Sequence, residues 1–241
     1  MRVLTALTLL SLAACSGTSE ATANKGGYDV AEGSSIRQFP ARDFAGVALL
    51  GSDDVDISTG QDFSVRAEGG DEALDRLKIE VRDHVLRIGH KDTGWSWGSH
   101  EGAVIHVTMP AIRTARISGS GNMTIDRAEG PFEGSIAGSG DLTVGAVDGP
   151  SAEFDIAGSG TLSAAGRVDR LSMAIDGSGD IKAGGLTARQ ASVEIAGSGD
   201  ATAAVNGNAN VSVLGSGDVD LGGQARCTIN SSGSGDVHCG G

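Results

Sequence analysis

Short runs of alternating apolar and polar residues recur through the second half of the chain, on both sides of repeated Gly-Ser-Gly triplets. Apolar residues stand three positions before and three positions after the central serine of almost every triplet. The preceding column is Ile117, Ile136, Ile156, Ile175, Ile195 and Val213, broken by Ser231, and the following column is Met123, Leu142, Leu162, Ile181, Ala201, Val219 and Val237. Alternation with a period of two predicts β-strands with one buried and one exposed face.

The triplet occurs seven times, and neighbouring serines are 18 to 20 residues apart. The serines are Ser120, Ser139, Ser159, Ser178, Ser198, Ser216 and Ser234. Each repeat therefore predicts a strand, a tight corner, a second strand and a return segment, and stacked repeats of this length are typical of a solenoid. We expect an all-β fold, a right-handed parallel β-helix or β-solenoid with rungs of about 19 residues. An apolar residue in several return segments predicts a third wall (Val147, Val168, Leu186 and Val205).

A degenerate copy of the repeat lies upstream, where residues 51–57 match residues 215–221. The coil is therefore expected to begin near Phe44. Residues 61–112 form a less regular β region, with strands at 63–65, 77–81, 85–88 and 104–109 and a helical turn at 72–77. We predict one domain over residues 36–241, of which 36–112 are irregular and 113–241 regular.

The N-terminus predicts export and lipidation. Met1-Arg2 precedes an apolar run that is too short to span a bilayer, and Leu12-Ala13-Ala14-Cys15 follows it. The last four residues resemble a lipobox, so we expect a signal peptide over 1–14, lipidation of Cys15 and a flexible tether over 15–35. The alternative is an ordinary signal peptide cut nearby. Because Ser16, and not an aspartate, follows the cysteine, we expect a lipoprotein in the outer membrane of a Gram-negative bacterium, on its periplasmic or its surface face.

Cys227 and Cys239 lie on the two predicted strands of the last repeat, and both are expected to point inward. In an exported protein two such cysteines are expected to form a disulfide, which would close the last rung. Two buried thiols are the alternative. A metal site is disfavoured because only His238 is nearby and is expected to face outward.

The net charge of −13 argues against nucleic acid and against anionic lipid surfaces as partners, because both would be repelled.

An acidic column follows the corners. The residue two positions after the serine is Asn122, Asp141, Thr161, Asp180, Asp200, Asp218 or Asp236. Stacked carboxylates repel one another, so something must offset the charge. We favour side chains that accept hydrogen bonds from N–H groups at the corners. The alternative is calcium held between rungs by Asp180, Asp200, Asp218 and Asp236. No other cofactor is expected.

Trp95 and Trp97 lie in a glycine-bracketed loop, Gly94-Trp95-Ser96-Trp97-Gly98. Exposed indoles could stack on sugar rings or contact a protein partner. Folding back over the open end of the coil is the more common fate of large apolar side chains.

No nucleophile elbow, phosphate loop or zinc-helix motif is present in the sequence. The serines of the triplets are not expected to be catalytic, because a nucleophile is not repeated seven times. A calcium-dependent polysaccharide lyase is the one enzymatic alternative, and it depends on analogy with other β-helices.

The order of these features resembles the bacterial family of putative autotransporter adhesins with a head GIN domain. The resemblance is carried by residues 44–57, 71–81, 107–110, 117–121 and the repeats, and covers about residues 36–241. It implies a β-helical domain in the bacterial envelope with a suspected role in adhesion, and it supplies no catalytic residues. Here a lipid anchor is expected in place of autotransport.

Our leading hypothesis is a non-enzymatic envelope lipoprotein that binds a glycan or protein partner through its side or the tryptophan loop. The second is a periplasmic structural or assembly protein that self-associates through the solenoid ends, and the third is the lyase.

Overall fold

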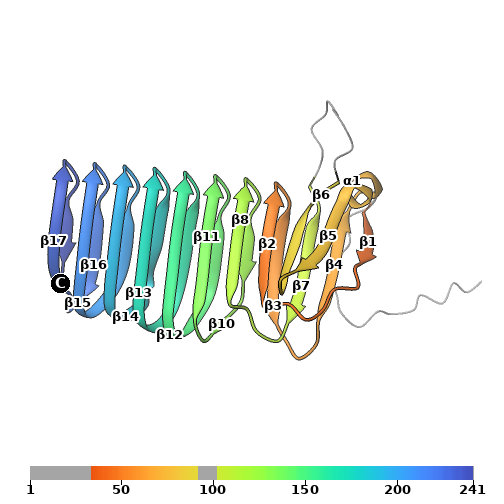
Figure 1. The fold of residues 1–241 in the computed structure, drawn as a ribbon, viewed down its shortest axis with the longest axis horizontal. Helices are drawn as coiled ribbons and strands as arrows, with labels where there is room; N and C mark the ends of the chain where they lie inside the picture. The colour runs from red at the N-terminus through yellow and green to blue at the C-terminus, as the bar shows by residue number, and fades with distance from the viewer. Residues whose placement is uncertain (1–33, 92–101, 241) are drawn as a thin grey trace, which may run out of the picture. The chain divides into compact units, whose positions relative to one another are not determined.

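Two columns of parallel strands run along the solenoid axis and meet at the Gly-Ser-Gly corners (Figure 1). The computed structural model describes residues 34–91 and 102–240. Contacts divide the chain into Met1–Ala31 and Glu32–Gly241, and all described residues belong to the second unit. This unit is the predicted β-solenoid, with about seven turns and a less regular N-terminal region. The hand of the coil stays a prediction.

The front sheet consists of the strands that precede the corners. They are β2 (Gly46–Gly51), β8 (Thr114–Gly119), β11 (Phe132–Gly138), the second parts of β12 (Leu142–Gly158), β13 (Thr161–Gly177), β14 (Asp180–Gly197) and β15 (Ala201–Gly215), and β17 (Arg226–Gly233). Neighbouring strands in this order pair in parallel.

The back sheet consists of the strands that follow the corners. They are β3 (Asp54–Thr59), β9 (Met123–Ile125), the first parts of β12 to β15, β16 (Val219–Gly223) and β18 (Val237–Cys239). In β12 to β15 the return segment stays paired with its neighbours, so one long strand bends from the back sheet to the front sheet at register shifts. The short β10 (Ala128–Glu129) pairs with β12 in this third wall.

The predicted apolar columns form the core. The column before the corners is buried from Ile117 to Val213, the column after them from Met123 to Val219, and the four return residues Val147, Val168, Leu186 and Val205 are at most 1% exposed. The columns fail only in the last rung, where Ser231 is exposed and Ile229 is 49% exposed. In the described chain no further rung covers these side chains.

The corners require glycine at both outer positions. The first glycine of the seven triplets has φ between +133° and +141°, a region that residues with a side chain rarely adopt. A Cβ at that position would also collide with the carbonyl oxygen of the equivalent glycine one rung before, as at Gly158 against Gly138. The third glycine would collide in the same way, as at Gly160 against Gly140.

The region before the regular repeats is a cap whose spatial order differs from its chain order. Its elements are β1 (Ser35–Gln38), β4 (Ser64–Gly69), α1 (Asp71–Arg76), β5 (Leu77–Arg82), β6 (Val85–His90) and β7 (Val104–Met109). The strands β6 and β7 stack in parallel on β2 and β3, while β8 and β9 stack on their other side. The predicted strands and helical turn of residues 61–112 are thus confirmed. The strands β6 and β7 form an additional rung, and β4 and β5 pair with them in antiparallel orientation.

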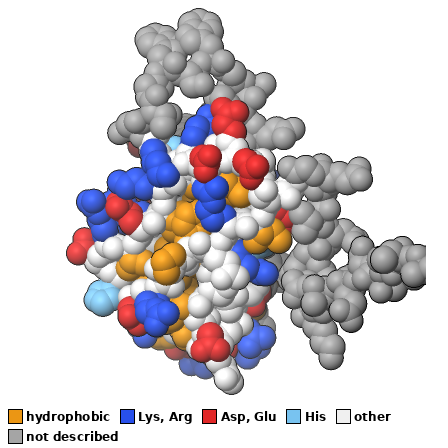
Figure 2. All heavy atoms as spheres, turned by 90° about the vertical axis from the view of Figure 1, so that its right-hand side faces the viewer, with side chains coloured by type: hydrophobic (Ala, Val, Ile, Leu, Met, Phe, Trp, Pro, Cys, Tyr) orange, Lys and Arg blue, Asp and Glu red, His pale blue; other side chains and the backbone are white. Residues whose placement is uncertain are grey.

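The end of the solenoid that carries the cap is covered by antiparallel strands, because β5 pairs with β6, β4 with β7 and β1 with β4. Charged side chains of both signs surround a few apolar ones on this end (Figure 2). Glu80 lies 3.5 Å from Lys78 and 3.0 Å from Arg82. Charged side chains and antiparallel covering strands are the usual protection of a sheet edge.

Candidate functional site

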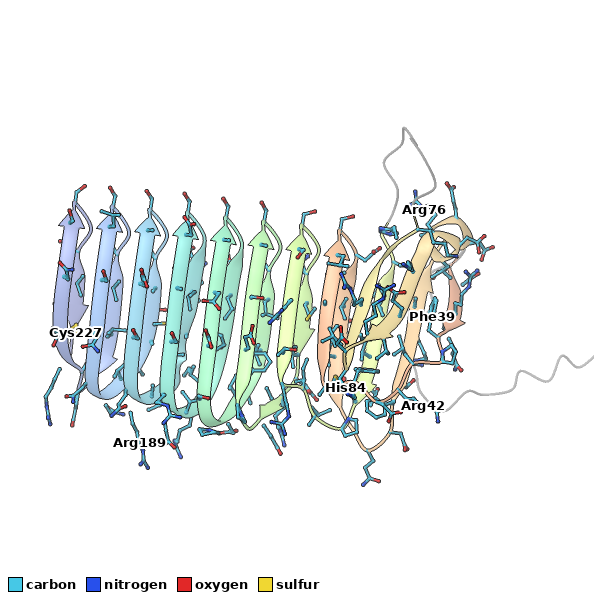
Figure 3. All side chains as sticks on the ribbon, in the orientation of Figure 1. Phe39, Arg42, Arg76, His84, Arg189 and Cys227 are labelled. Atoms are coloured by element: carbon cyan, nitrogen blue, oxygen red, sulfur yellow. A yellow bond between two sulfur atoms is a disulfide. The ribbon has the colours of Figure 1, made fainter. Side chains whose placement is uncertain are left out.

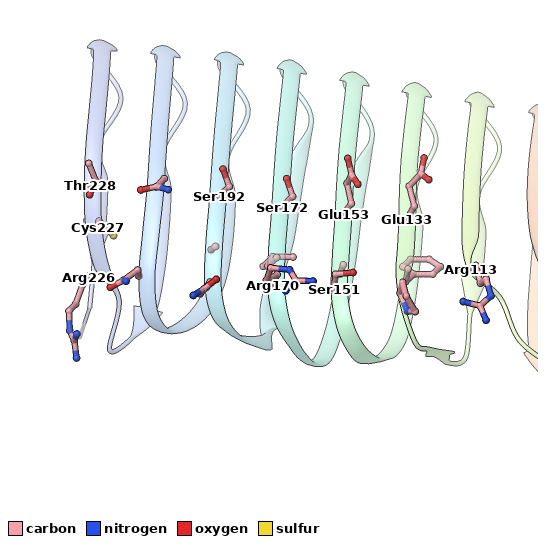
Figure 4. Close-up of a pocket in the computed structure, with 18 of the residues that line it drawn as sticks. Arg113, Glu133, Ser151, Glu153, Arg170, Ser172, Ser192, Arg226, Cys227 and Thr228 are labelled. Atoms are coloured by element: carbon pink, nitrogen blue, oxygen red, sulfur yellow. The ribbon is translucent and has the colours of Figure 1, made fainter.

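An open groove of about 1040 Å³ runs along the outer face of the front sheet, from β8 to β17. Alternate residues of a strand point to the same face, so each rung contributes an outward residue to each of two neighbouring columns. One column is Ser151, Arg170, Gln190, Asn208 and Arg226, and the other is Thr114, Glu133, Glu153, Ser172, Ser192, Asn210 and Thr228. Figure 4 shows these side chains following one another from rung to rung.

The groove is polar because the strand pattern leaves amide, hydroxyl and charged groups on its outer face. The apolar residues between the two columns, including Leu171, point inward and are buried. Amide and hydroxyl groups both donate and accept hydrogen bonds, while guanidinium groups only donate. The surface can therefore recognise hydroxyl and carboxylate groups along an extended ligand.

Acidic side chains gather at one part of this face. Arg116 lies 2.6 Å from Glu133, which neutralises that carboxylate. Partial burial of Asp155, and then the nearby carboxylates of Glu153 and Glu133, raise the pKa of the Asp155 carboxyl above its ordinary value of 3.8. Asp155 lies beside the groove, in a smaller hollow of about 500 Å³ that Arg116 also lines.

The acidic column after the corners is joined by hydrogen bonds between rungs. The N–H of Asp218 donates to Asp200 Oδ1 at 2.9 Å, and the N–H of Asp236 donates to Asp218 Oδ1 at 2.8 Å. The same bond joins Asn122 to Asp54, Asp141 to Asn122, Thr161 to Asp141 and Asp200 to Asp180. The acceptor role that we favoured for these side chains is therefore present, and it reaches the next rung instead of the residue's own turn.

Among the described residues, no group of three or more His, Cys, Asp or Glu side chains is arranged to hold a metal ion. The calcium alternative for Asp180, Asp200, Asp218 and Asp236 stays a prediction, to be tested by calcium titration.

The last rung is crosslinked as predicted, because Cys227 of β17 and Cys239 of β18 form a disulfide. Both cysteines are partly buried against the core, and His238 is exposed. Figure 3 shows Cys227 at the end of the coil that lies opposite the cap. Two free buried thiols, the alternative, are not what the structure contains.

Two of the predicted site groups lie outside the described residues, namely Cys15 and the tryptophan pair Trp95 and Trp97. The segment that carries the tryptophans connects β6 to β7, where other rungs have a Gly-Ser-Gly corner. The structure describes the residues on either side of this segment. Asp53, only 2% exposed, lies 3.1 Å from Nε2 of His90 and accepts a hydrogen bond of 2.9 Å from the N–H of Ala103.

Sequence reasoning did not find the groove or the Asp53–His90 pair. Asp53 occupies the position of the third corner glycine, and this departure from the repeat was the one available signal. The preceding rung joins β6 to β7 through residues 91–103, which contain no Gly-Ser-Gly triplet.

The fold and the polar face define a parallel β-solenoid with a lateral groove. Comparison with known protein families matches residues 43–225 to the family described as putative auto-transporter adhesin, head GIN domain. The chain belongs to this family. A comparison with curated proteins finds no match.

Solved structures share the fold at low sequence identity. A putative adhesin from Bacteroides fragilis is 17% identical with a TM-score of 0.79, covering 88% of this chain and 99% of its own. A putative lipid binding protein from Parabacteroides distasonis is 22% identical with a TM-score of 0.70, covering 87% of this chain and 97% of its own. A putative adhesin from Parabacteroides merdae is 18% identical with a TM-score of 0.69, covering 87% of this chain and 97% of its own. These likenesses support the fold alone.

Within the part of the chain that the structure describes, no helix is long and apolar enough to cross a membrane. The polysaccharide lyase alternative finds no support in the family or in the similar structures.

Proposed function

We propose that this protein is a non-enzymatic, adhesin-like binding module that takes a glycan or a protein partner into the groove of the front sheet. The groove is the observation that carries the proposal, because it presents two continuous polar columns on a rigid, repetitive surface. A partner that lies along the axis can contact every rung without any movement of the sheet. The family's description as adhesins agrees with this role.

The test compares one blocking variant with one control variant. Ser172 lies exposed in the groove, and Thr143 lies exposed on the back sheet. Ser172→Trp should fill the groove and reduce binding to arrayed glycans and envelope or host proteins at least about tenfold, while Thr143→Trp should not. Equal binding by both variants would remove the groove from the proposal.

The proposal includes a lipid anchor at Cys15 in the outer membrane of a Gram-negative bacterium. The lipobox-like residues 12–15 support it, and the tether over 15–35 would let the solenoid move away from the membrane. Cys15→Ser should release the protein from the membrane fraction and abolish labelling with a fatty-acid analogue. Protease treatment of intact and permeabilised cells then assigns the surface or the periplasmic face. Release without loss of labelling would contradict the anchor.

A structural role through end-to-end self-association is a second candidate. In the described chain, β17 and β18 have a strand neighbour on one side only. Ile229 is exposed on β17, and Leu214 is exposed on β15, one rung before it. An open strand edge can pair with a second copy. Light scattering over a range of concentrations should then show dimers that Ile229→Lys abolishes, and a monomer at every concentration would end this candidate.

A further inference from the structure

Three arginines line the groove without a partner for their charge. Arg113, Arg170 and Arg226 are exposed, and within residues 34–91 and 102–240 none has an ion pair or a side-chain hydrogen bond. Other arginines are neutralised, as Arg116 is by Glu133 at 2.6 Å and Arg189 by Asp169 at 3.3 Å. Arg189 also projects from the return side of the coil (Figure 3).

The three arginines are evenly spaced along the axis. Arg170 pairs in register with Gln190, Gln190 with Asn208, and Asn208 with Arg226, so Arg170 and Arg226 are three rungs apart. Arg113 precedes Thr114 of β8, and β8, β11, β12 and β13 are successive rungs, so Arg113 is also three rungs from Arg170. With neighbouring strands about 4.8 Å apart, the cationic groups recur about every 14 Å.

Neutral hydrogen-bonding side chains fill the space between Arg170 and Arg226, among them Gln190, Ser192 and Asn208. Two carboxylates line the groove, and Glu133 is already paired with Arg116. Three arginines against the one remaining carboxylate, Glu153, leave a local charge of +2 in a chain whose net charge is −13. The groove is thus a cationic strip on an acidic protein, and its positive charge is sparse.

We propose that the groove binds an extended acidic polysaccharide whose carboxylate or sulfate groups contact Arg113, Arg170 and Arg226 in turn. This inference rests on the proposed function and names its ligand class. A guanidinium group binds carboxylate or sulfate with two parallel hydrogen bonds, and the amide and hydroxyl side chains between Arg170 and Arg226 suit sugar hydroxyls. A sugar residue in an extended chain is about as long as the spacing of the rungs, about 4.8 Å, so successive sugars can stay in step with successive side chains.

The same face is poorly suited to other linear polymers. Its backbone N–H and C=O groups are paired between rungs, so a peptide cannot add to it as a strand. Pro131 is the one exposed apolar residue among those that line it, whereas Phe132 and Leu171 are buried, so it offers no large apolar anchor of the kind that dominates protein interfaces. A DNA strand carries one charge about every 3.4 Å and a duplex one about every 1.7 Å, and such a dense polyanion would be repelled by the acidic remainder of the chain. A polysaccharide with separated acidic groups has a lower charge density and is repelled less.

Calorimetry with size-fractionated hyaluronan tests the inference, with dextran as the uncharged polysaccharide and single-stranded DNA as the densely charged polymer for comparison. Hyaluronan carries a carboxylate on every second sugar, about every 10 Å at the rung spacing, so its carboxylates coincide with Arg113 and Arg226 and lie about 5 Å to either side of Arg170, within reach of that long side chain. It should bind, with affinity that rises as the oligosaccharide becomes longer than about 14 Å and again beyond about 29 Å, because a second and a third arginine come within reach. Arg170→Gln should weaken binding at least about tenfold, and the triple variant of Arg113, Arg170 and Arg226 should abolish it. Arg167→Gln is the matched control, because Arg167 lies on the same strand β13 outside the groove.

The variants also separate this inference from the proposed function. If a neutral glycan or a protein binds and Ser172→Trp prevents that binding, while hyaluronan fails to bind, the groove is a binding site but its ligand is not an acidic polysaccharide. If hyaluronan binding is insensitive to Arg170→Gln, or if DNA of equal charge binds as tightly, the inference also falls. If Ser172→Trp affects no partner, the proposed function falls with it. Circular dichroism of each variant establishes that the fold is retained.

Discussion

The carboxylate of Asp53 lies 3.1 Å from Nε2 of His90 at the junction between the cap and the first rung, and it is almost completely buried. Its other oxygen accepts the N–H of Ala103, so one side chain holds both ends of the connection from β6 to β7. Oδ2 makes no hydrogen bond within the described residues, so the approach of His90 and the hydrogen bond from Ala103 are what offset the cost of burying this carboxylate.

Asp53→Ala is therefore expected to destabilise the cap. The N–H of Ala103 would lose its acceptor, and the free energy of unfolding should fall by about 2 kcal/mol in urea titrations. Asp220→Asn, at an exposed position of β16, is the control and should change it by less than about 0.5 kcal/mol. Equal effects of the two variants would show that the pair does not hold the cap.

Gly158→Ala should be among the most damaging single changes in the repeats. Gly158 has φ of +138° and faces the backbone of Gly138, so a methyl group brings both strain and a collision. We expect a loss of at least about 3 kcal/mol in chemical unfolding. The adjacent Ser159→Ala removes an exposed hydroxyl and should be almost neutral, and a comparable loss there would contradict this account of the corner.

In the acidic column, Asp200→Asn should preserve stability and Asp200→Ala should lower it. Asparagine keeps an oxygen that can accept the N–H of Asp218 and removes like-charge repulsion, whereas alanine leaves that N–H without its acceptor, at a cost of about 1 kcal/mol. Thermal unfolding with and without calcium also tests the calcium alternative. A calcium-dependent rise in Tm that Asp200→Asn abolishes would establish a metal ladder, and no rise would retire it.

Asp155→Asn should raise stability at neutral pH. The pKa of Asp155 is raised in the folded state, so between 3.8 and that raised pKa the folded protein binds more protons than the unfolded chain. Stability therefore falls as pH rises through this window, and the loss is complete above the folded pKa. The variant should remove this dependence and gain less than about 1 kcal/mol, since the group is partly exposed. Tm measured from acidic to neutral pH checks it. A variant less stable than the parent at neutral pH would contradict the sign.

Reduction of the Cys227–Cys239 disulfide should loosen the last rung without unfolding the coil. The bond closes a short loop with a sequence separation of 12, for which loss of about 3 kcal/mol of local stability is typical. Each rung contacts mainly the rungs directly before and after it, so the effect should stay local. Hydrogen exchange with and without reductant should show lost protection in β17 and β18 and unchanged protection in β12 and β13. Loss of protection throughout would show that the rungs unfold as one unit.

Much of this architecture could be predicted from the sequence because it depends on a short repeating pattern of residues. Within each repeat, the apolar column from Ile117 to Val213 and the corner glycines specify a strand, a corner and a second strand. Each of the two strands has one apolar face, and stacking the repeats buries both of these faces. The cap shows the limit of such reasoning. The strands β6 and β7 were predicted. Their position beside β2 and β3, on the side opposite β8 and β9, depends on contacts between residues that are distant in the sequence.

The candidate site was less accessible to prediction. Arg113, Arg170 and Arg226 do not recur at one position of the repeat, so they look scattered along the chain. They become a row only in the stacked structure, where each lines the groove three rungs from the next, although Arg113 stands one position out of register with Arg170.

The sequence by itself determined the coil, its corners, its buried columns and the cysteines of its last rung, because each depends on residues within a repeat or at its exact period. Only the tertiary structure decided which exposed side chains share the groove, and that Asp53 meets His90 and Ala103. Polar residues on an outer face need not pack, so the repeat does not constrain them, and their function depends on the neighbours that stacking supplies.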